Sequence, residues 1–116
     1  MAKRLDLLTQ THDLLYILGV RATMMGFFET SCAVYLLSQE PDNAWFSIME
    51  LYQRISELYH VDIDEIDPRI RRVIGKVWSK HPEILRRISG EKLEKQPSPR
   101  QFIQMLRHYL YKRNPV

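Results

Sequence analysis

The stretch from residue 51 to residue 80 constrains the fold most, because its apolar residues recur at the spacing of a helix. From residue 63 onward these residues are three or four positions apart, which places them on one side of a helix. They are Ile63, Ile66, Ile70, Val73, Ile74, Val77 and Trp78. The other side and its flanks carry mostly cations: Arg69, Arg71, Arg72 and Lys76. A helix that is buried along one edge, cationic along the other and preceded by a short partner helix is typical of a helix-turn-helix that enters a DNA groove.

The composition favours one all-helical domain over residues 1–116. The chain is 45% hydrophobic and 27% charged, which is ordinary for a globular protein. It has only four glycines and shows no β alternation between turn signals, so we expect an all-α fold. No apolar run approaches the roughly 18 residues of a membrane span, and no signal peptide follows Met1. A cytoplasmic protein with no membrane partner is expected.

Cysteine and histidine usage argues against a metal site or a cofactor. Cys32 is the single cysteine, so an internal disulfide is excluded, and the four histidines are scattered over separate segments. No nucleophile–base set or phosphate loop is present, so we predict neither an enzyme nor a small-molecule substrate.

Charge is divided sharply along the chain. Residues 1–67 carry four Lys/Arg against eleven Asp/Glu, a balance of −7, and residues 68–116 carry thirteen against three, a balance of +10; the two add to the net +3. Such a split predicts a polyanion partner for the second half, or neutralisation within the protein or between the subunits of a homodimer.

Cap and turn signals predict a compact bundle of about six helices. We expect a first helix that begins at Thr9 or Thr11 and ends at Gly19, a second over about 23–38, and a third from near Asn43 to residue 59.

The next helix begins either at Asp62, with Glu65 completing a capping box, or at Asp67, with Pro68 as its first helical residue. The later start is favoured, because proline well inside a helix costs about 3 kcal/mol. This helix ends near His81. A short helix over about 83–88, a polar loop over 91–99 and a C-terminal helix over about 99–112 complete the prediction.

Three segments carry a resemblance to a known family. Residues 19–27 read Gly-Val-Arg-Ala-Thr-Met-Met-Gly-Phe and are similar to the family's Gly-Val-Pro-Ala-His-Ile-Lys-Gly-Tyr. Residues 51–79 keep the family's length, its apolar positions and its Ile-Arg pair, here at residues 70 and 71. Residues 96–103 resemble its closing Lys-Pro-Thr…Glu-Phe-Ile helix. The chain thus resembles, from about residue 11 to residue 110, the C-terminal effector domain of the sporulation initiation response regulator, stage zero A.

The resemblance implies a six-helix, all-α domain that binds DNA through a helix-turn-helix, commonly as a tandem dimer. In that family the domain follows a phosphorylatable receiver. This chain starts at Met1 with no room for a receiver, so we expect a regulator that lacks one.

Several departures fall at positions that the resemblance makes candidates for contact with DNA. The family's His and Lys of the early motif are replaced by Thr23 and Met25. Its Ser-Arg-Val-Glu-Arg becomes Asp-Glu-Ile-Asp-Pro at residues 64–68, so Pro68 stands where a base-reading arginine is expected and Glu65 stands where the preceding cation is expected. Acids there repel phosphates, by about 1 kcal/mol per pair at 4 Å in water.

The leading prediction is a transcription regulator that binds double-stranded DNA. Arg71 and Arg72 are expected to contact bases or phosphates, within a basic face that includes Arg69. Lys76, Lys80 and Arg100 are expected to hold phosphates. The alternatives are a basic face that is merely solvated, and a protein-interaction module that kept the fold but lost specific DNA reading. Such a module would bind its partner through the acidic turn at 62–67 or the Met/Phe-rich helix.

Overall fold

The computed structural model describes residues 2–42 and 44–113, with side chains from residue 7 onward, and contains six helices and no strand within them. This confirms the all-helical prediction. The helices are α1 (Ala2–Ile17), α2 (Phe27–Ser38), α3 (Ile48–Tyr59), α4 (Ile63–Lys80), α5 (Pro82–Ser89) and α6 (Pro99–Arg113). None of these helices has the length and apolarity that a bilayer crossing requires.

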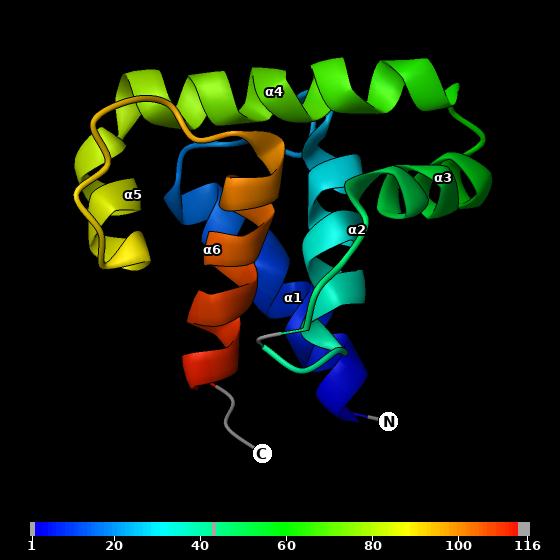
Figure 1. Cartoon of the computed structure of the whole chain (residues 1–116), viewed down its shortest axis with the longest axis horizontal. Coiled ribbons are helices and arrows are strands. Elements are labelled where there is room, and N and C mark those ends of the chain that lie inside the picture. Colours follow the sequence, from blue (N-terminus) through cyan, green and yellow to red (C-terminus); the bar gives the residue numbers. More distant parts are fainter. Residues whose placement is uncertain (1, 43, 114–116) are drawn as a thin grey trace.

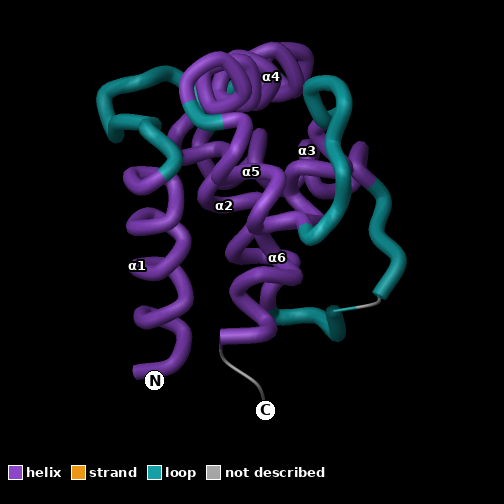
Figure 2. The backbone as a smooth tube through the Cα atoms, turned by 90° about the vertical axis from the view of Figure 1, so that its left-hand side faces the viewer, coloured by secondary structure: helices purple, strands orange, loops and turns teal. Residues whose placement is uncertain are grey.

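Helix α4 lies across the top of the molecule, over the ends of α2 and α6 (Figure 1). Helices α1, α2 and α6 pack against one another beneath it, while α3 and α5 lie under its two ends. A view turned by 90° shows α4 end-on above α1 and α6 (Figure 2). In both views α1 begins and α6 ends on the side of the molecule that faces away from α4.

The predicted apolar stripe of α4 is what holds this helix on the bundle. Ile66, Ile70, Val73, Ile74 and Val77 are all fully buried and belong to one core with residues of the other five helices. Trp78 continues the stripe but is only half-buried, contrary to the expectation that it would be buried. The Arg86 guanidinium covers it, 5.1 Å from the ring centroid.

The first two helices begin elsewhere than predicted. Helix α1 begins at Ala2, and Thr11 lies inside it, where its hydroxyl donates a hydrogen bond to the Leu7 carbonyl (2.8 Å). A threonine that bonds back to the preceding turn fits within a helix and gives no start. Helix α2 begins at Phe27 rather than near residue 23, because Gly26 has φ 101°, which cannot continue a right-handed helix.

Helix α3 begins at Ile48, where Ser47 accepts a hydrogen bond from the Glu50 amide (3.2 Å). The predicted start near Asn43 lies outside the described residues, and residues 44–47 are not helical. The turn that joins α3 to α4 spans residues 60–62 and is stabilised by the Ser56 hydroxyl, which donates to the Val61 carbonyl (2.5 Å).

The favoured start of α4 is wrong and the earlier one is right. The helix begins at Ile63, and the Asp62 carboxylate caps it by accepting from the Asp64 amide (3.0 Å). Pro68 therefore lies inside the helix. It removes one backbone donor, but the capped first turn and the burial of Ile66 before it outweigh that loss. The predicted ends of α4, α5 and α6 are confirmed to within one residue.

Candidate nucleic-acid interface

The outward edge of α4 carries two kinds of charge. Acids occupy its first turns, at the exposed Asp64 and Glu65, and cations occupy the remainder, at the exposed Arg71, Arg72 and Lys80. The buried stripe described above orients this edge, since it fixes which side of the helix faces the bundle. The exposed positive charge of this edge is therefore confined to the C-terminal two-thirds of α4.

Arg69 does not contribute a free cation to this edge. Its Nη1 donates to Glu29 Oε2 of α2 at 2.6 Å, and its Nη2 lies 3.7 Å from Glu65 Oε2. The Glu29 side chain is only 8% exposed, so the pair joins α4 to α2 in a partly buried setting. The hydrogen bond with Glu29 raises the pKa of Arg69.

Arg71 is held by a chain of hydrogen bonds that links α3 to α4. Its Nε donates to Asp67 Oδ2 at 2.5 Å, and the Tyr52 hydroxyl donates to Asp67 Oδ1 at 2.7 Å. We call this the Tyr52–Asp67–Arg71 chain. The interaction with the carboxylate occupies the Nε donor of Arg71 and offsets the charge of this predicted base reader.

The pKa values of these groups follow from the same contacts. Burial raises the pKa of Asp67, but the hydrogen bonds from Tyr52 and Arg71 outweigh it, so that the net pKa is below the ordinary value. Burial and the bond to Asp67 raise the pKa of Tyr52. The carboxylate is therefore ionised, and the phenol neutral, over the physiological range.

Three of the predicted cations on α4 are free to meet a ligand. Arg72 and Lys80 are exposed and Lys76 is half-buried, and within the described ranges none of their side chains makes an ion pair or a hydrogen bond. They lie at positions 72, 76 and 80 of one helix, and this spacing of four places them in a row. Among the described residues no acid forms an ion pair with this row, whereas Arg69 and Arg71 each have one.

Arg100 stands apart from this row. It lies in α6, where its Nη2 donates to the Phe46 carbonyl (2.7 Å) and its guanidinium is 4.4 Å from the Phe46 ring centroid. The side chain thus binds the segment that leads into α3 rather than extending the cations of α4. It is exposed, so its remaining donors still face solvent.

The early motif at residues 19–27 has a clear structural role. Gly26 is buried where α2 begins, and a Cβ atom added to it would lie 2.4 Å from the carbonyl oxygen of Arg69. The glycine therefore allows this turn to approach the α4 backbone closely. Thr23 and Met25, which replace two polar family residues, are both exposed.

The sequence reasoning missed two features of this region. Arg87, Lys92 and Lys95 are exposed in α5 and the loop after it, close along the chain to the cationic end of α4; the charge excess of residues 68–116 was the signal for them. Tyr52 was missed as the residue that positions Asp67. No local signal predicts it, because the two residues are 15 positions apart and meet only through the turn.

Acids and histidines of the described part of the chain do not gather into a metal-ligand cluster. No group of three or more His, Cys, Asp or Glu side chains there is arranged to hold a metal ion. His108 Nδ1 instead forms a pair with Asp42 Oδ2 at 2.5 Å.

Comparison with known proteins gives one result that bears on this geometry. Residues 11–110 match the family model described as "Sporulation initiation factor Spo0A C terminal". This match spans nearly the whole chain and includes the turn at Gly26, the α3–α4 pair and most of α6. No curated protein and no solved structure matches the chain.

Proposed function

Because this chain belongs to the family of sporulation initiation factor Spo0A C-terminal domains, a DNA-binding and not a catalytic family, we propose that it binds double-stranded DNA and regulates transcription. In this proposal α3 and α4 form the helix-turn-helix, and the outward edge of α4 enters the major groove. The observation that supports it best is the row of cations at Arg72, Lys76 and Lys80, which have no acidic partner among the described residues.

Each cation in the row has a distinct part in the proposal. Arg72 reads a guanine edge, since a guanidinium pairs bidentately with O6 and N7. Lys76 and Lys80 hold phosphates and set the register. Arg71 joins them only when it leaves Asp67, and the acids at the start of α4 keep the duplex toward the other end of the helix.

The test is binding of fluorescent duplexes, followed by anisotropy over a range of salt concentrations. The double variant Arg71→Ala/Arg72→Ala should bind about tenfold or more weakly, and its log–log salt slope should fall by roughly one for each phosphate that the variant no longer neutralises. The matched control is Arg113→Ala at the end of α6, on the side of the molecule away from α4, which should bind almost as the parent does. An unchanged affinity and slope for the double variant on every duplex tried would refute this assignment.

A second candidate is a protein-interaction module that has lost specific DNA reading. Two observations favour it: the ion pairs that occupy Arg69 and Arg71, and the exposure of large apolar side chains near the turn at Gly26. Met25, Phe28 and Tyr59 are 53%, 45% and 42% exposed and line one surface hollow. Retention on calf-thymus DNA at low salt, measured beside light scattering, separates the two. A self-associating protein that ignores DNA would support the module.

A further inference from the structure

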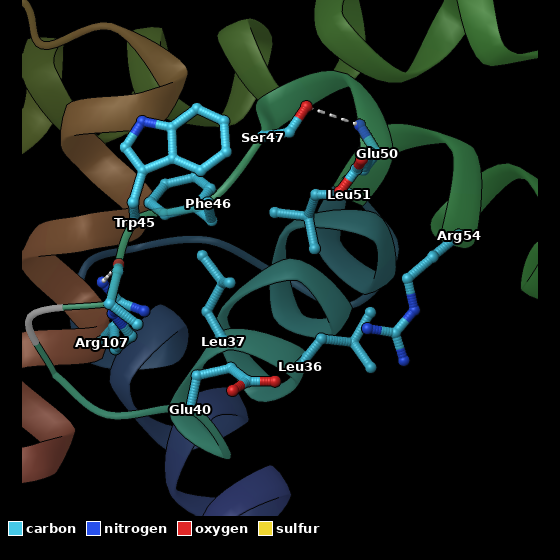
Figure 3. Close-up of a pocket in the computed structure, with 11 residues that line it drawn as sticks. Leu36, Leu37, Glu40, Trp45, Phe46, Ser47, Glu50, Leu51, Arg54 and Arg107 are labelled. Carbon is cyan, nitrogen blue, oxygen red and sulfur yellow. Dashed lines mark hydrogen bonds between the residues drawn. The ribbon is translucent and has the colours of Figure 1, made fainter.

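A cavity of about 300 Å³ lies between the end of α2, the segment before α3 and helix α6 (Figure 3). Its wall is of mixed polarity: Leu36, Leu37, Phe46 and Leu51 form the apolar part, and charged and polar side chains form the rest. Trp45 stands over one end, with 80% of its surface exposed. A cavity of this size accommodates a small organic molecule.

Arg107 lines the same cavity, and its charge is poorly compensated. The residue is 1% exposed. Its Nη2 donates to the Ala44 carbonyl (3.0 Å) and to the Gln104 side chain, and the guanidinium is 5.4 Å from the Phe46 ring centroid. Its Nε and Nη1 are buried and have no hydrogen-bond partner among the described residues.

The neighbouring acids do not remove this deficit. Within residues 2–42 and 44–113 Arg107 forms no ion pair. The nearby Asp42 pairs with His108 through Oδ2, and its Oδ1 is buried and has no hydrogen-bond partner among the described residues. Burial lowers the pKa of Arg107, and Asp42 and Glu40 oppose that shift only through space. A buried guanidinium has five donors to satisfy, and leaving several without acceptors is unfavourable.

We propose that this cavity binds a small organic monocarboxylate, whose anionic group meets Arg107 and whose apolar body lies along Leu36, Leu37 and Leu51. A carboxylate supplies the acceptor oxygens and the negative charge that the guanidinium lacks. The acids at the cavity rim, Glu40 and Glu50, disfavour ligands with several negative charges. The site is separate from the outward edge of α4, so this inference does not rest on DNA binding.

Octanoate is the probe that tests the proposal, with octanamide as the neutral ligand of the same shape. Binding is followed by the tryptophan emission of the Trp78→Phe protein, in which Trp45 is the sole remaining tryptophan, and by the shift in Tm. Octanoate should change the Trp45 emission and raise Tm, and octanamide should bind about tenfold or more weakly, because it lacks the charge. Equal affinity for the two compounds, or no binding of octanoate, would overturn the proposal.

Two variants and a control locate the ligand. Arg107→Met keeps much of the side-chain volume and should weaken octanoate binding at least about tenfold. If that protein fails to fold, Leu36→Trp decides, since it fills the cavity and leaves Arg107 in place; it should abolish the shift in Tm, which is the readout here because the new tryptophan obscures the Trp45 emission. Arg87→Met removes an exposed cation of α5 that does not line the cavity and should leave the octanoate Kd within about twofold. Parent-like binding by folded Arg107→Met or by Leu36→Trp would refute the assignment.

Discussion

Gly26 marks the point where the turn before α2 touches the backbone of α4. Its φ of 101° lies in the region that side chains avoid, and the Arg69 carbonyl occupies the space where a Cβ would lie. Conformation and contact therefore both require glycine at this residue. The neighbouring Arg69–Glu29 pair fastens the same two helices at their side chains.

Gly26→Ala should reduce the free energy of unfolding by more than about 2 kcal/mol, because it adds a clash to the cost of left-handed backbone. Gly90→Ala is the matched control: φ is also positive, at 68°, but no atom lies within 4 Å of the added Cβ. That variant should lose only about 1 kcal/mol. Urea unfolding measures both, and equal losses would show that the approach to α4 is unimportant.

Asp67 should make stability depend on pH in the acid range. Its pKa in the folded protein is below the ordinary 3.8, so the carboxylate stabilises the fold above that pH and loses its contribution as the pH falls through the folded value. Urea unfolding between about pH 5 and pH 2 should therefore show the advantage of the parent over Asp67→Asn shrinking as acid is added. Tyr52→Phe, which removes one donor, should weaken this dependence. An advantage that is constant with pH would contradict the Tyr52–Asp67–Arg71 chain.

Helix α4 contains a proline, although proline is disfavoured in the interior of a helix. Pro68 sits in the sixth position of the helix, and it is exposed. Pro68→Ala restores a backbone donor in a helix that is already formed, so the free energy of unfolding should rise by about 1–3 kcal/mol. Chemical denaturation monitored by far-UV circular dichroism measures the change. A loss of stability would mean that proline fits this turn better than alanine does.

The Asp67–Arg71 ion pair within α4 also predicts a gain of DNA affinity. Asp67→Asn should release Arg71 and remove one negative charge. The control is Asp64→Asn, which changes an exposed acid three residues earlier in the same helix and removes only the charge. Both variants should bind duplexes more tightly than the parent, and Asp67→Asn should exceed its control by about two- to fivefold. Fluorescence anisotropy at one fixed salt concentration gives the comparison. Equal gains would show that the Asp67–Arg71 pair does not restrain the arginine.

For the molecule as a whole, the fold was largely predictable and the site only partly so. Periodicity identified the buried stripe of α4 and the last three helix ends, because apolar spacing and capping are local properties of the chain. The start of α1 was missed because Thr11 bonds back to Leu7 inside the helix. The start of α4 was missed because the Asp62 cap and the burial of Ile66 outweigh the proline signal. No local pattern encodes how the helices meet. The bond between Tyr52 and Asp67 and the ion pair between Arg69 and Glu29, which are 40 residues apart, depend on that arrangement.

The shared core predicts one cooperative unfolding event. Phe102, at 0% exposure in α6, packs in the same cluster as residues from the other five helices. Thermal transitions followed by far-UV and near-UV circular dichroism should coincide, and Phe102→Ala should shift both together, with a loss of about 3–5 kcal/mol. Separate transitions for the two probes would indicate that the chain is not a single folding unit.

Helix α1 begins and helix α6 ends on the side of the molecule that faces away from α4. A dye, an affinity handle or an immobilising linker attached at the start of α1 or the end of α6 would lie on the side of the molecule opposite α4, the helix that carries Arg72, Lys76 and Lys80. Surface-captured protein would thus present that row outward, which suits solid-phase selection of preferred duplexes from a random pool.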